Sequence, residues 1–418
     1  MTEKRAYTEA VKTGKYQKET GLLGKYDNVR RFWEDEATRI FMRPYLNNLV
    51  DQKRKRLERL RILDLGCGSG DGHDLLMGVT SKDPGIYEYI VDVITPEILS
   101  LYMGVDVNQN LLNQARDIYH NNNKMNFIQG DFSKGLPLDK DEPAFDIYFT
   151  SFGTLSHNTD EQTIQLLADI ARHIHKYGLI ICDWLGRYSY EWQDLWDSNP
   201  QEETFMEYRI SYIYPPEERD KVEIQSFPLR ILTRDEALRM VQEASRKAGI
   251  EITVSRFFDR SIFVGRHMDT AEYNSNCPKM RRAVNSLFES NLRTDLETVI
   301  IDYVPRIGFG HLNNFFEGFS MCWNALVNYT VEIFSHYDIE RRSITYAPEI
   351  FPYYPDPLKQ TMQTIYKVIE GAGWLHGGDT RADIIEPQLG YALRKLEMDM
   401  QSGLGYGHGL VGIFEVIK

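Results

Sequence analysis

The stretch from residue 61 to residue 72, RILDLGCGSGDG, decides the fold of this chain. A short apolar run ends at Asp64, and glycine then occupies every second position, at residues 66, 68, 70 and 72. This pattern predicts a buried parallel strand that leads through a tight glycine loop into a helix. Because glycine has no Cβ, such a loop lets the backbone approach a nucleotide-like ligand closely.

Strand and helix patterns alternate on both sides of that loop as far as residue 186. Apolar strand-like runs occupy 61–66, 101–107, 124–132, 144–153 and 177–186, and helical patterns occupy 108–120 and 160–176. The alternation predicts an α/β fold, a doubly wound and mostly parallel sheet with helices on both faces. Ligands of such sheets bind at the carboxyl ends of the strands.

The flanking regions divide the chain into three predicted parts. Residues 1–60 are polar and helical, with apolar residues at helical spacing between Val29 and Phe41. Residues 61–270 form the sheet domain, which we expect to close near residue 268. Residues 271–418 are expected to be an extra, mainly helical accessory region that ends in a strand, and to serve acceptor selection or dimerisation.

Bulk composition narrows the function classes. The 418 residues carry a net charge of −13, and the pI is about 5.3. Nucleic-acid enzymes usually have a basic footprint, so no nucleic-acid partner is expected. No apolar run is long enough to span a membrane, and the first residues lack an apolar signal-peptide core. The four cysteines are scattered and form no CxxC pair, so we expect a reduced, cytoplasmic protein. The aromatic-rich accessory region makes a homodimer possible.

The spacing of the glycines tests three kinds of nucleotide loop. A phosphate-binding loop of the G-x-x-x-x-G-K-[ST] type requires a lysine, and none follows these glycines. A dinucleotide loop, G-x-G-x-x-G, would need glycine at 71 or 73, where Asp71 and His73 stand. The remaining pattern is D-x-G-x-G-x-G, from Asp64 to Gly70.

Residues 61–268 resemble the class I S-adenosylmethionine-dependent methyltransferases, which have a Rossmann-like fold. LDLGCGSG is close to the first motif of that family, and GVDVNQNLLNQAR is similar to the second. IQGDF resembles the third motif, TSFGTLSH stands where the fourth belongs, and YGLIICDWLG resembles the fifth strand. The resemblance implies S-adenosyl-L-methionine as cofactor and methyl transfer as the reaction.

The resemblance also implies the roles of individual residues. Asp106 would hold the two ribose hydroxyls, Asp131 would accept from the adenine amino group, and Phe132 would flank the ring. A carboxylate suits both positions, because it accepts hydrogen bonds and the ligand groups donate them. Further cofactor-binding residues are expected at Asp64, Gly66, Cys67, Gly68, Gly70, Val107 and Ser151. The 36 residues between Gly70 and Asp106 exceed the usual spacing, so Asp92 stays open as the alternative ribose acid.

Candidates for cofactor closure and for proton transfer are fewer. By resemblance, Tyr26, Arg30 or Trp33 of a helical lid would contact the cofactor, and an arginine there can pair with a carboxylate. His157, just past the fourth strand, is the best single candidate for a catalytic base. The alternative role for His157 is packing or helix capping. Neither His311 nor His408 belongs to a recognisable metal-binding spacing, and no metal is expected.

The sequence therefore predicts methyl transfer to a small-molecule acceptor, and leaves O-, N- and C-methylation open. Aromatic residues after the fifth strand could form the wall of an acceptor pocket, namely Trp184, Tyr188, Tyr190 and Trp192. Two alternatives remain. One is an aminopropyl transferase that uses decarboxylated S-adenosylmethionine, for which the acidic residues at 160–161 are a weak signal. The other is a non-catalytic binding or scaffold protein.

Overall fold

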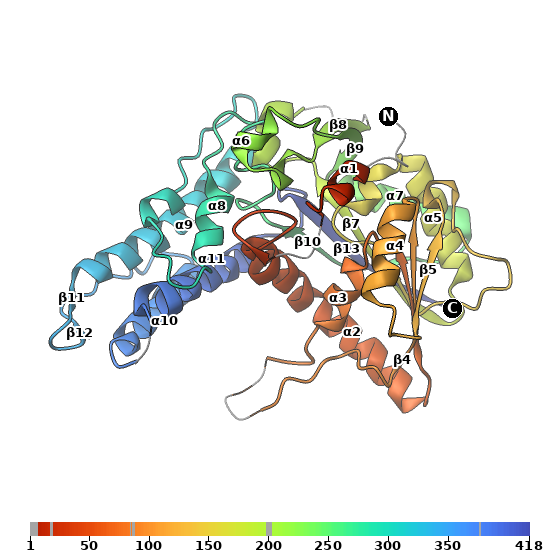
Figure 1. Cartoon of the computed structure of the whole chain (residues 1–418), viewed down its shortest axis with the longest axis horizontal. Helices are drawn as coiled ribbons and strands as arrows, with labels where there is room; N and C mark the ends of the chain where they lie inside the picture. The colour runs from red at the N-terminus through yellow and green to blue at the C-terminus, as the bar shows by residue number, and fades with distance from the viewer. Residues whose placement is uncertain (1–6, 17–19, 84, 86–87, 198–202, 376–377) are drawn as a thin grey trace.

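The computed structural model describes residues 7–16, 20–83, 85, 88–197, 203–375 and 378–418. Its centre is a nine-stranded sheet (Figure 1). Five mutually parallel strands lie side by side in the order β5-β4-β3-β6-β7. They are β3 (Leu60–Leu65), β4 (Leu99–Asp106), β5 (Met125–Gln129), β6 (Ile147–Phe149) and β7 (Tyr177–Gly186). The chain runs outward in both directions from β3, so β3 and β6 flank the switch point at which such sheets bind ligands.

Helices cover both faces of this sheet, as the alternating pattern predicts. Side chains alternate along β3, so Ile62 faces one apolar core and Leu63 faces the other. The first core contains residues of α2 (Asp35–Lys55), α3 (Asp71–Met77) and α4 (Gln109–Ile118). The second contains residues of α5 (Asp160–His173) and α7 (Arg234–Ala248). The Rossmann-like fold class is confirmed.

The helices that follow the strands begin where the sequence provides caps. Asn108 accepts hydrogen bonds from the backbone of Asn110 and Leu111 at the start of α4. Thr159 begins α5 and Thr233 begins α7, each in a reciprocal capping box. These caps fix the points at which the chain leaves the carboxyl edge of the sheet.

The last strand of the chain corrects the expected boundary at residue 270. β13 (Gly409–Ile417) lies between β7 and β10 (Thr253–Arg260) and is antiparallel to both. Residues 261–408 are therefore an insertion between two neighbouring strands, and the sheet does not close near residue 268. A hairpin of β8 (Thr204–Arg209) and β9 (Ser226–Leu232) extends the end of β7.

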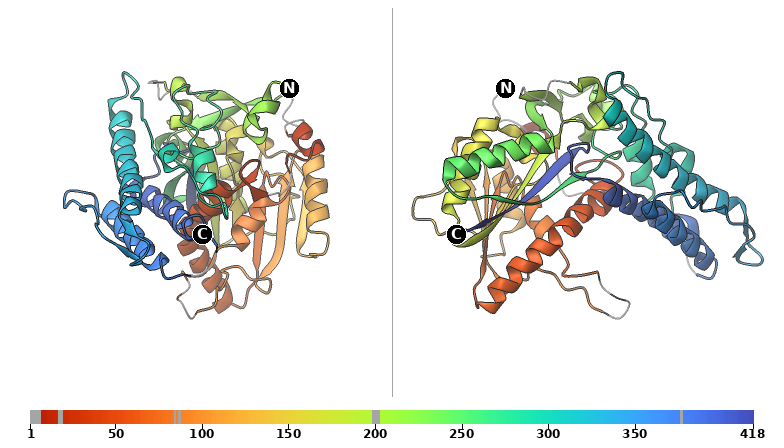
Figure 2. Two further views of the ribbon diagram at one scale, coloured as in Figure 1. Left: turned by 60° about the vertical axis from the view of Figure 1, so that its left-hand side comes forward. Right: turned by 180° about the vertical axis from the view of Figure 1, so that it is seen from behind.

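The insertion is mainly helical and extends away from the sheet as an arm (Figures 1 and 2). Its long helices share one apolar core, to which Phe316, Trp323, Ile365 and Leu393 belong. The helices are α8 (Met280–Ser286), α9 (Gly310–Ser335), α10 (Asp356–Ala372) and α11 (Glu386–Met400).

The smaller elements of the whole chain are α1 (Thr8–Lys12), α6 (Pro216–Arg219), β1 (Thr20–Gly21), β2 (Tyr26–Asp27), β11 (Tyr337–Asp338) and β12 (Ser343–Ile344).

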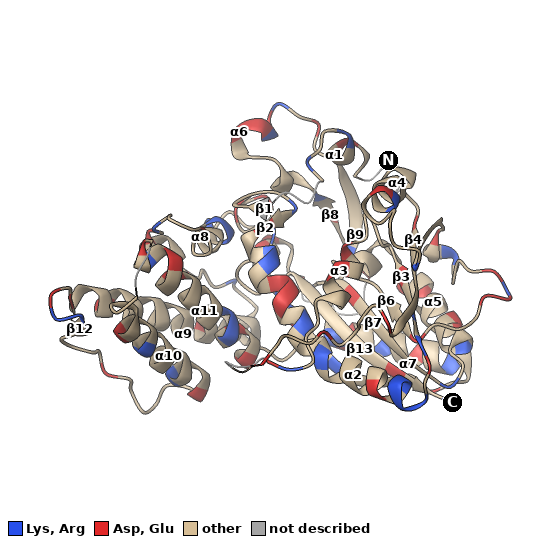
Figure 3. Cartoon of the chain, turned by 60° about the horizontal axis from the view of Figure 1, so that its bottom comes forward, with Lys and Arg blue, Asp and Glu red and all other residues tan. Residues whose placement is uncertain are grey.

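The N-terminal region is not the single helical lid that the sequence predicts. Its described part comprises α1, the strand pair β1–β2 and a π-helical turn, Arg30–Glu34, that continues into α2. α2 packs on the sheet, with Phe41, Met42 and Leu46 in the first core. Acidic and basic residues are interspersed along α2 (Figure 3). No described helix has the length and apolarity to cross a membrane.

Candidate active site

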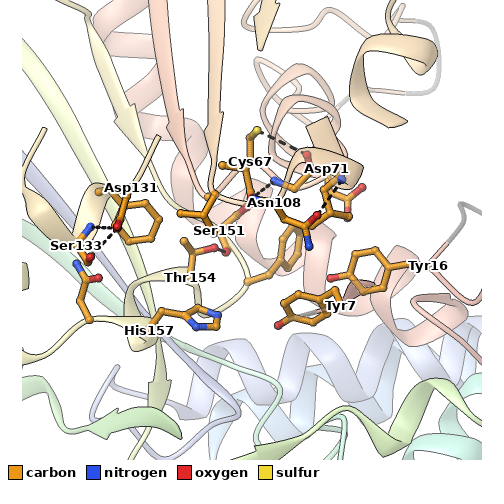
Figure 4. Close-up of a pocket in the computed structure, with 18 of the residues that line it drawn as sticks. Tyr7, Tyr16, Cys67, Asp71, Asn108, Asp131, Ser133, Ser151, Thr154 and His157 are labelled. Atoms are coloured by element: carbon orange, nitrogen blue, oxygen red, sulfur yellow. Dashed lines mark hydrogen bonds between the residues drawn. The ribbon is translucent and has the colours of Figure 1, made fainter. Parts of the chain in front are cut away.

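A pocket lies at the carboxyl ends of β3 and β4 and at the turn after β6 (Figure 4). We call it the outer pocket. In Figure 4, Asp131 and Ser133 lie at one end of it, and Asp71 and Tyr16 lie at the other. Its lining residues are Tyr7, Tyr16, Lys25, Gly66, Cys67, Gly68, Asp71, Asp106, Val107, Asn108, Leu111, Asp131, Phe132, Ser133, Ser151, Phe152, Thr154, His157 and Asn158.

The glycine loop brings backbone to the wall of this pocket. Gly66, Cys67 and Gly68 line it directly. Gly66 has a φ of 73°, and a Cβ there would lie 2.2 Å from Thr154 Cγ2. A side chain at residue 66 would therefore be strained and would collide with the opposite wall. Gly70 does not line the pocket. It stands at the start of α3 and packs against the ring of Tyr119.

Asp106 ends β4 and lines the pocket. Oδ1 accepts a hydrogen bond from Asn108 N at 2.7 Å, and Oδ2 accepts one from Gly68 N at 2.9 Å. Burial raises the pKa of Asp106, and these backbone donors oppose the increase. Each oxygen keeps a lone pair for a ligand donor. The alternative acid, Asp92, is exposed, pairs with Thr80 in an isolated bridge and does not line the pocket.

Asp131 and Phe132 follow β5 at one end of the pocket, where the sequence places them. Asp131 Oδ1 accepts hydrogen bonds from Ser133 N and Oγ, at 3.2 and 2.6 Å. Burial alone would raise the pKa of Asp131, but Ser133 and Lys134 hold it below its usual value. Asn158 also lines this pocket and is 2% exposed. Neither polar atom of its carboxamide has a hydrogen-bond partner among the described residues.

Asp64 does not line the pocket, contrary to the expectation that it would bind the cofactor directly. It is fully buried behind the glycine loop, and Oδ2 accepts a hydrogen bond from the Tyr102 hydroxyl. Burial raises the pKa of Asp64 to about 7, against the effect of Tyr102. A Cβ on Gly72 would lie 2.3 Å from Asp64 Oδ2, so the last glycine of the motif makes room for this carboxyl group.

The other end of the pocket is built by the N-terminal segment. Lys25 Nζ lies 2.6 Å from Asp71 Oδ2 and 3.9 Å from the Tyr16 ring centroid. The Arg30 guanidinium lies 3.5 Å from Asp71 and 3.6 Å from the Phe152 ring centroid. Sequence reasoning missed Tyr7, Tyr16, Lys25 and Asp71. The ring of Tyr26 lies 4.8 Å from the Arg30 guanidinium but lines no pocket wall.

A second cavity continues inward from the outer pocket and shares part of its wall. We call it the inner chamber. Tyr7, Tyr16, Lys25, Asp71, Phe152 and His157 line both cavities. The other residues of the inner chamber are Arg30, Gly153, Leu185, Tyr208, Tyr212, Leu229, Arg260, Arg266 and His408. Most of these residues are buried, and they come from the N-terminal segment, the β8–β9 hairpin, the end of β10 and the residue before β13.

His157 reaches both cavities, as the sequence predicts, but its surroundings are apolar. Its ring lies 5.3 Å from the ring of Phe227. Burial lowers the pKa of His157 to about 4, so the imidazole is neutral at neutral pH. The aromatic residues expected as an acceptor wall lie elsewhere. Trp184, Tyr190 and Trp192 are core residues, and neither they nor Tyr188 line the two cavities.

Buried ion pairs hold the N-terminal segment against the insertion. Arg281 donates to Asp27 at 2.6 Å and to Glu34 at 2.7 Å. Glu34 also lies 3.4 Å from both Arg260 and Arg266, which line the inner chamber. Burial alone would raise the pKa of Glu34, but Arg281, Arg266 and Arg260 hold it well below its usual value. These contacts join residues far apart in sequence.

Comparison with known proteins identifies the domain that contains this site. Residues 96–178, from β4 to the start of β7, match the family model of the methyltransferase domain. No curated protein sequence matches the chain significantly. The chain contains a class I methyltransferase domain.

Solved structures resemble the methyltransferase domain only distantly. A methyltransferase in complex with the Haloferax volcanii Trm112 methyltransferase activator has 20% identity and a TM-score of 0.28, over 49% of this chain and 66% of that one. An S-adenosylmethionine-dependent methyltransferase from Clostridium acetobutylicum has 14% identity and a TM-score of 0.36, over 54% and 83%. The glycopeptide N-methyltransferase MtfA with sinefungin has 16% identity and a TM-score of 0.34, over 61% and 91%. These scores support no argument about substrate.

Proposed function

We propose that this protein transfers the methyl group of S-adenosylmethionine to a small-molecule acceptor that enters the inner chamber. The observation that carries the proposal is the continuity of the two cavities, which share His157, Phe152 and four further wall residues. A cofactor in the outer pocket and an acceptor in the inner chamber would meet at this shared wall. When bound, S-adenosylmethionine supplies an electrophilic methyl group that is displaced in line.

The outer pocket fits the nucleoside part of the cofactor. Asp106 offers acceptors for a ribose diol, and the loop of Gly66, Cys67 and Gly68 allows close backbone approach. At the far end, Asp131 would accept from the adenine amino group, and Phe132 would flank the ring. Val107 and Ser151 complete this wall.

Asn158 fits the adenine edge as well. Adenine presents a donor beside an acceptor, and the unpartnered carboxamide of Asn158 offers an acceptor and a donor. A buried amide without partners is costly, so a ligand that satisfies both groups should bind more tightly.

The opposite end of the pocket fits a zwitterionic amino acid. Lys25 and Arg30 can pair with the methionine carboxylate, and Asp71 can accept from its ammonium group. The N-terminal segment would therefore bind the cofactor through Lys25 and Arg30, while Tyr26 supports the Arg30 guanidinium from behind.

The inner chamber supports a small acceptor. Arg260, Arg266, Tyr208 and His408 are each less than 9% exposed, so a macromolecular side chain would need a wide opening to reach them. The chamber also disfavours the aminopropyl-transferase alternative. Lys25 and three arginines line it, and a polyamine would bring further positive charge. Asp160, one of the acids that suggested a polyamine groove, instead pairs with Arg230 at 2.8 Å.

The test is methyl transfer from isotopically labelled cofactor into a host extract separated into metabolite and macromolecule fractions. We expect the label in the metabolite fraction, with S-adenosylhomocysteine formed in equal amount. Label in protein or nucleic acid would contradict the small-molecule acceptor. Cofactor binding without transfer to any fraction would favour the non-catalytic scaffold. The role of the helical arm in acceptor selection or dimerisation, and a cytoplasmic location, stay predictions.

A further inference from the structure

A carboxylate–imidazole pair stands at the wall of the inner chamber. His408 is the residue before β13, and its Nδ1 lies 2.8 Å from Glu191 Oε1. Burial alone would raise the pKa of Glu191, but His408 and His267 lower it. A carboxylate only accepts hydrogen bonds, so the geometry of the pair places the hydrogen on Nδ1 when Glu191 is ionised. Among the described residues no partner binds Nε2, the other ring nitrogen.

The structure fixes both members of this pair. Glu191 is fully buried and accepts further hydrogen bonds from His267 N at 2.5 Å and from Ser189 Oγ at 3.2 Å. His408 is held by backbone hydrogen bonds on both sides, from its own N to Ser261 O and from Gly186 N to its O. A carboxylate that orients an imidazole in this way also stabilises the imidazolium that proton uptake creates.

Backbone packing explains why the imidazole stands at this position. The loop GYGHG, residues 405–409, lies against β10 and the end of β9. A Cβ on Gly405 would lie 2.7 Å from Leu232 O, and one on Gly407 would lie 2.8 Å from Arg260 O. Only glycine allows this close approach, which sets the ring of His408 at the chamber wall beside Arg260 and Arg266.

The charge of the chamber wall restricts the acceptor. Lys25, Arg30, Arg260 and Arg266 line it, against the single carboxylate of Asp71. The carboxylates of Asp27, Glu34, Asp35 and Asp183 pair with these arginines from outside the chamber and offset part of their positive charge. The sulfonium of the cofactor adds another positive charge. The guanidinium and ammonium groups of the wall are hydrogen-bond donors, so they would stabilise the negative charge that develops on a hydroxyl oxygen during methyl transfer.

We propose that the inner chamber binds a neutral or anionic acceptor whose nucleophile is a hydroxyl group, and that His408 is the catalytic base for its methylation. This proposal rests on the proposed function. The hydroxyl O–H bond breaks and its proton goes to Nε2 of His408. The oxygen electron pair forms the new O–CH₃ bond, and the electron pair of the broken S–CH₃ bond stays on sulfur. The products are a methyl ether, S-adenosylhomocysteine and an imidazolium that returns its proton to solvent.

His408 suits this role better than His157, which also lines the chamber. Among the described residues no carboxylate orients His157, and burial lowers its pKa to about 4. Protonation of His157 would therefore be costly. The groups around His408 are the carboxylate of Glu191, the rings of His267, Tyr208 and Trp192, and, across the chamber wall, Glu34, Arg260 and Arg266.

The first test needs no acceptor. Nitrogen NMR of the full chain with labelled histidine should show Nδ1 of His408 protonated and Nε2 unprotonated at neutral pH, with the signal assigned by its loss in His408→Gln. In Glu191→Gln this tautomer preference should weaken, because an amide can also donate. A protonated Nε2 in the wild-type protein would overturn the proposal.

The second test follows turnover with the labelled acceptor fraction. His408→Gln should lower turnover about 10²- to 10⁴-fold while S-adenosylhomocysteine affinity stays within about threefold. His311→Gln, a matched change on the exposed arm, should leave turnover unchanged. The product should be a methyl ether by mass spectrometry and NMR. An N-, C- or S-methyl product, or a larger loss in His157→Gln than in His408→Gln, would overturn the proposal. Failure of the wild-type chain to bind cofactor would instead overturn the proposed function.

Discussion

His408 Nδ1 lies 2.8 Å from Glu191 Oε1, at hydrogen-bonding distance, although 217 residues separate the two in the chain. The contact exists because β13 returns to the sheet after the helical insertion and lies beside β7. The segment that contains Glu191 follows β7 in the chain. The insertion therefore contributes to the site through the strand that follows it. Its two ends at β10 and β13 supply Arg260 and His408 to the wall of the inner chamber.

Asn158→Ala separates a ligand-binding role from a structural one. The carboxamide is buried and makes no hydrogen bond to a described residue, so its removal should leave the free energy of unfolding of the ligand-free protein unchanged or raise it by up to about 1–3 kcal/mol. Affinity for S-adenosylhomocysteine should fall about 3- to 10-fold. Calorimetry and denaturant unfolding measure the two quantities. Unchanged affinity together with lost stability would show that Asn158 serves the fold alone.

Arg281→Met tests the ion pairs that hold the N-terminal segment. Removing the guanidinium leaves Asp27 and Glu34 buried without their closest cation, which should cost about 3–5 kcal/mol of unfolding free energy. The matched control is Arg282→Met, because Arg282 makes no ion pair with a described residue. This substitution should lower the free energy of unfolding by less than about 1 kcal/mol. Urea unfolding of both variants measures the difference. An equal loss of unfolding free energy in both variants would show that these ion pairs do not hold the N-terminal segment.

Gly407→Ala tests the loop that positions His408. The added methyl would lie 2.8 Å from the carbonyl oxygen of Arg260, in the backbone of β10. We therefore expect the free energy of unfolding to fall by about 1–3 kcal/mol. Gly318→Ala in α9 is the control. No atom lies within 4 Å of a Cβ at this position, so the alanine should raise the free energy of unfolding by up to about 1 kcal/mol through its higher helix propensity. Thermal unfolding compares the two, and an unaffected Gly407 variant would contradict the close packing of this loop.

Glu397 makes stability depend on pH. It accepts from Trp33 Nε1 at 2.9 Å and from Ile262 N at 3.0 Å, and burial raises its pKa to about 7. A raised pKa contributes stability that is fully present below the unfolded pKa of 4.5 and is lost as pH rises to the folded pKa of about 7, here roughly 3 kcal/mol in all. Glu397→Gln removes this loss. The stability of the variant relative to wild type should therefore increase with pH, and parallel pH curves would exclude Glu397 as a source.

Local patterns predict the parallel sheet and one wall of the outer pocket. The apolar run before Asp64, the glycine spacing and the strand–acid–helix order around Asp106 are all short-range signals, and each places its residue at the carboxyl edge of a strand. The same logic fails for Asp64. A strand-end acid can turn behind the glycine loop, where it bonds Tyr102, and no local signal distinguishes the two directions.

The rest of the site depends on contacts that no local pattern encodes. Lys25 lines both cavities and Arg30 lines the inner chamber, and Asp27 between them in the chain pairs with Arg281, 254 residues away. Asn158 follows a 3₁₀ turn, Thr154–His157, and its polar residue type alone does not show that it is buried. His408 had one usable signal, the glycines at 405, 407 and 409, which mark a backbone that packs unusually close to its neighbours.

The most direct test of the account is calorimetric titration of S-adenosylhomocysteine into the wild-type chain, Asp106→Ala and Asp92→Ala. We predict one site per wild-type chain, a loss of about 10- to 100-fold in affinity for Asp106→Ala, and unchanged affinity for Asp92→Ala. The reason is that Asp106 lines the outer pocket and Asp92 lies outside it. No binding by the wild type, or equal binding by Asp106→Ala, would contradict the central claim that the outer pocket holds the cofactor.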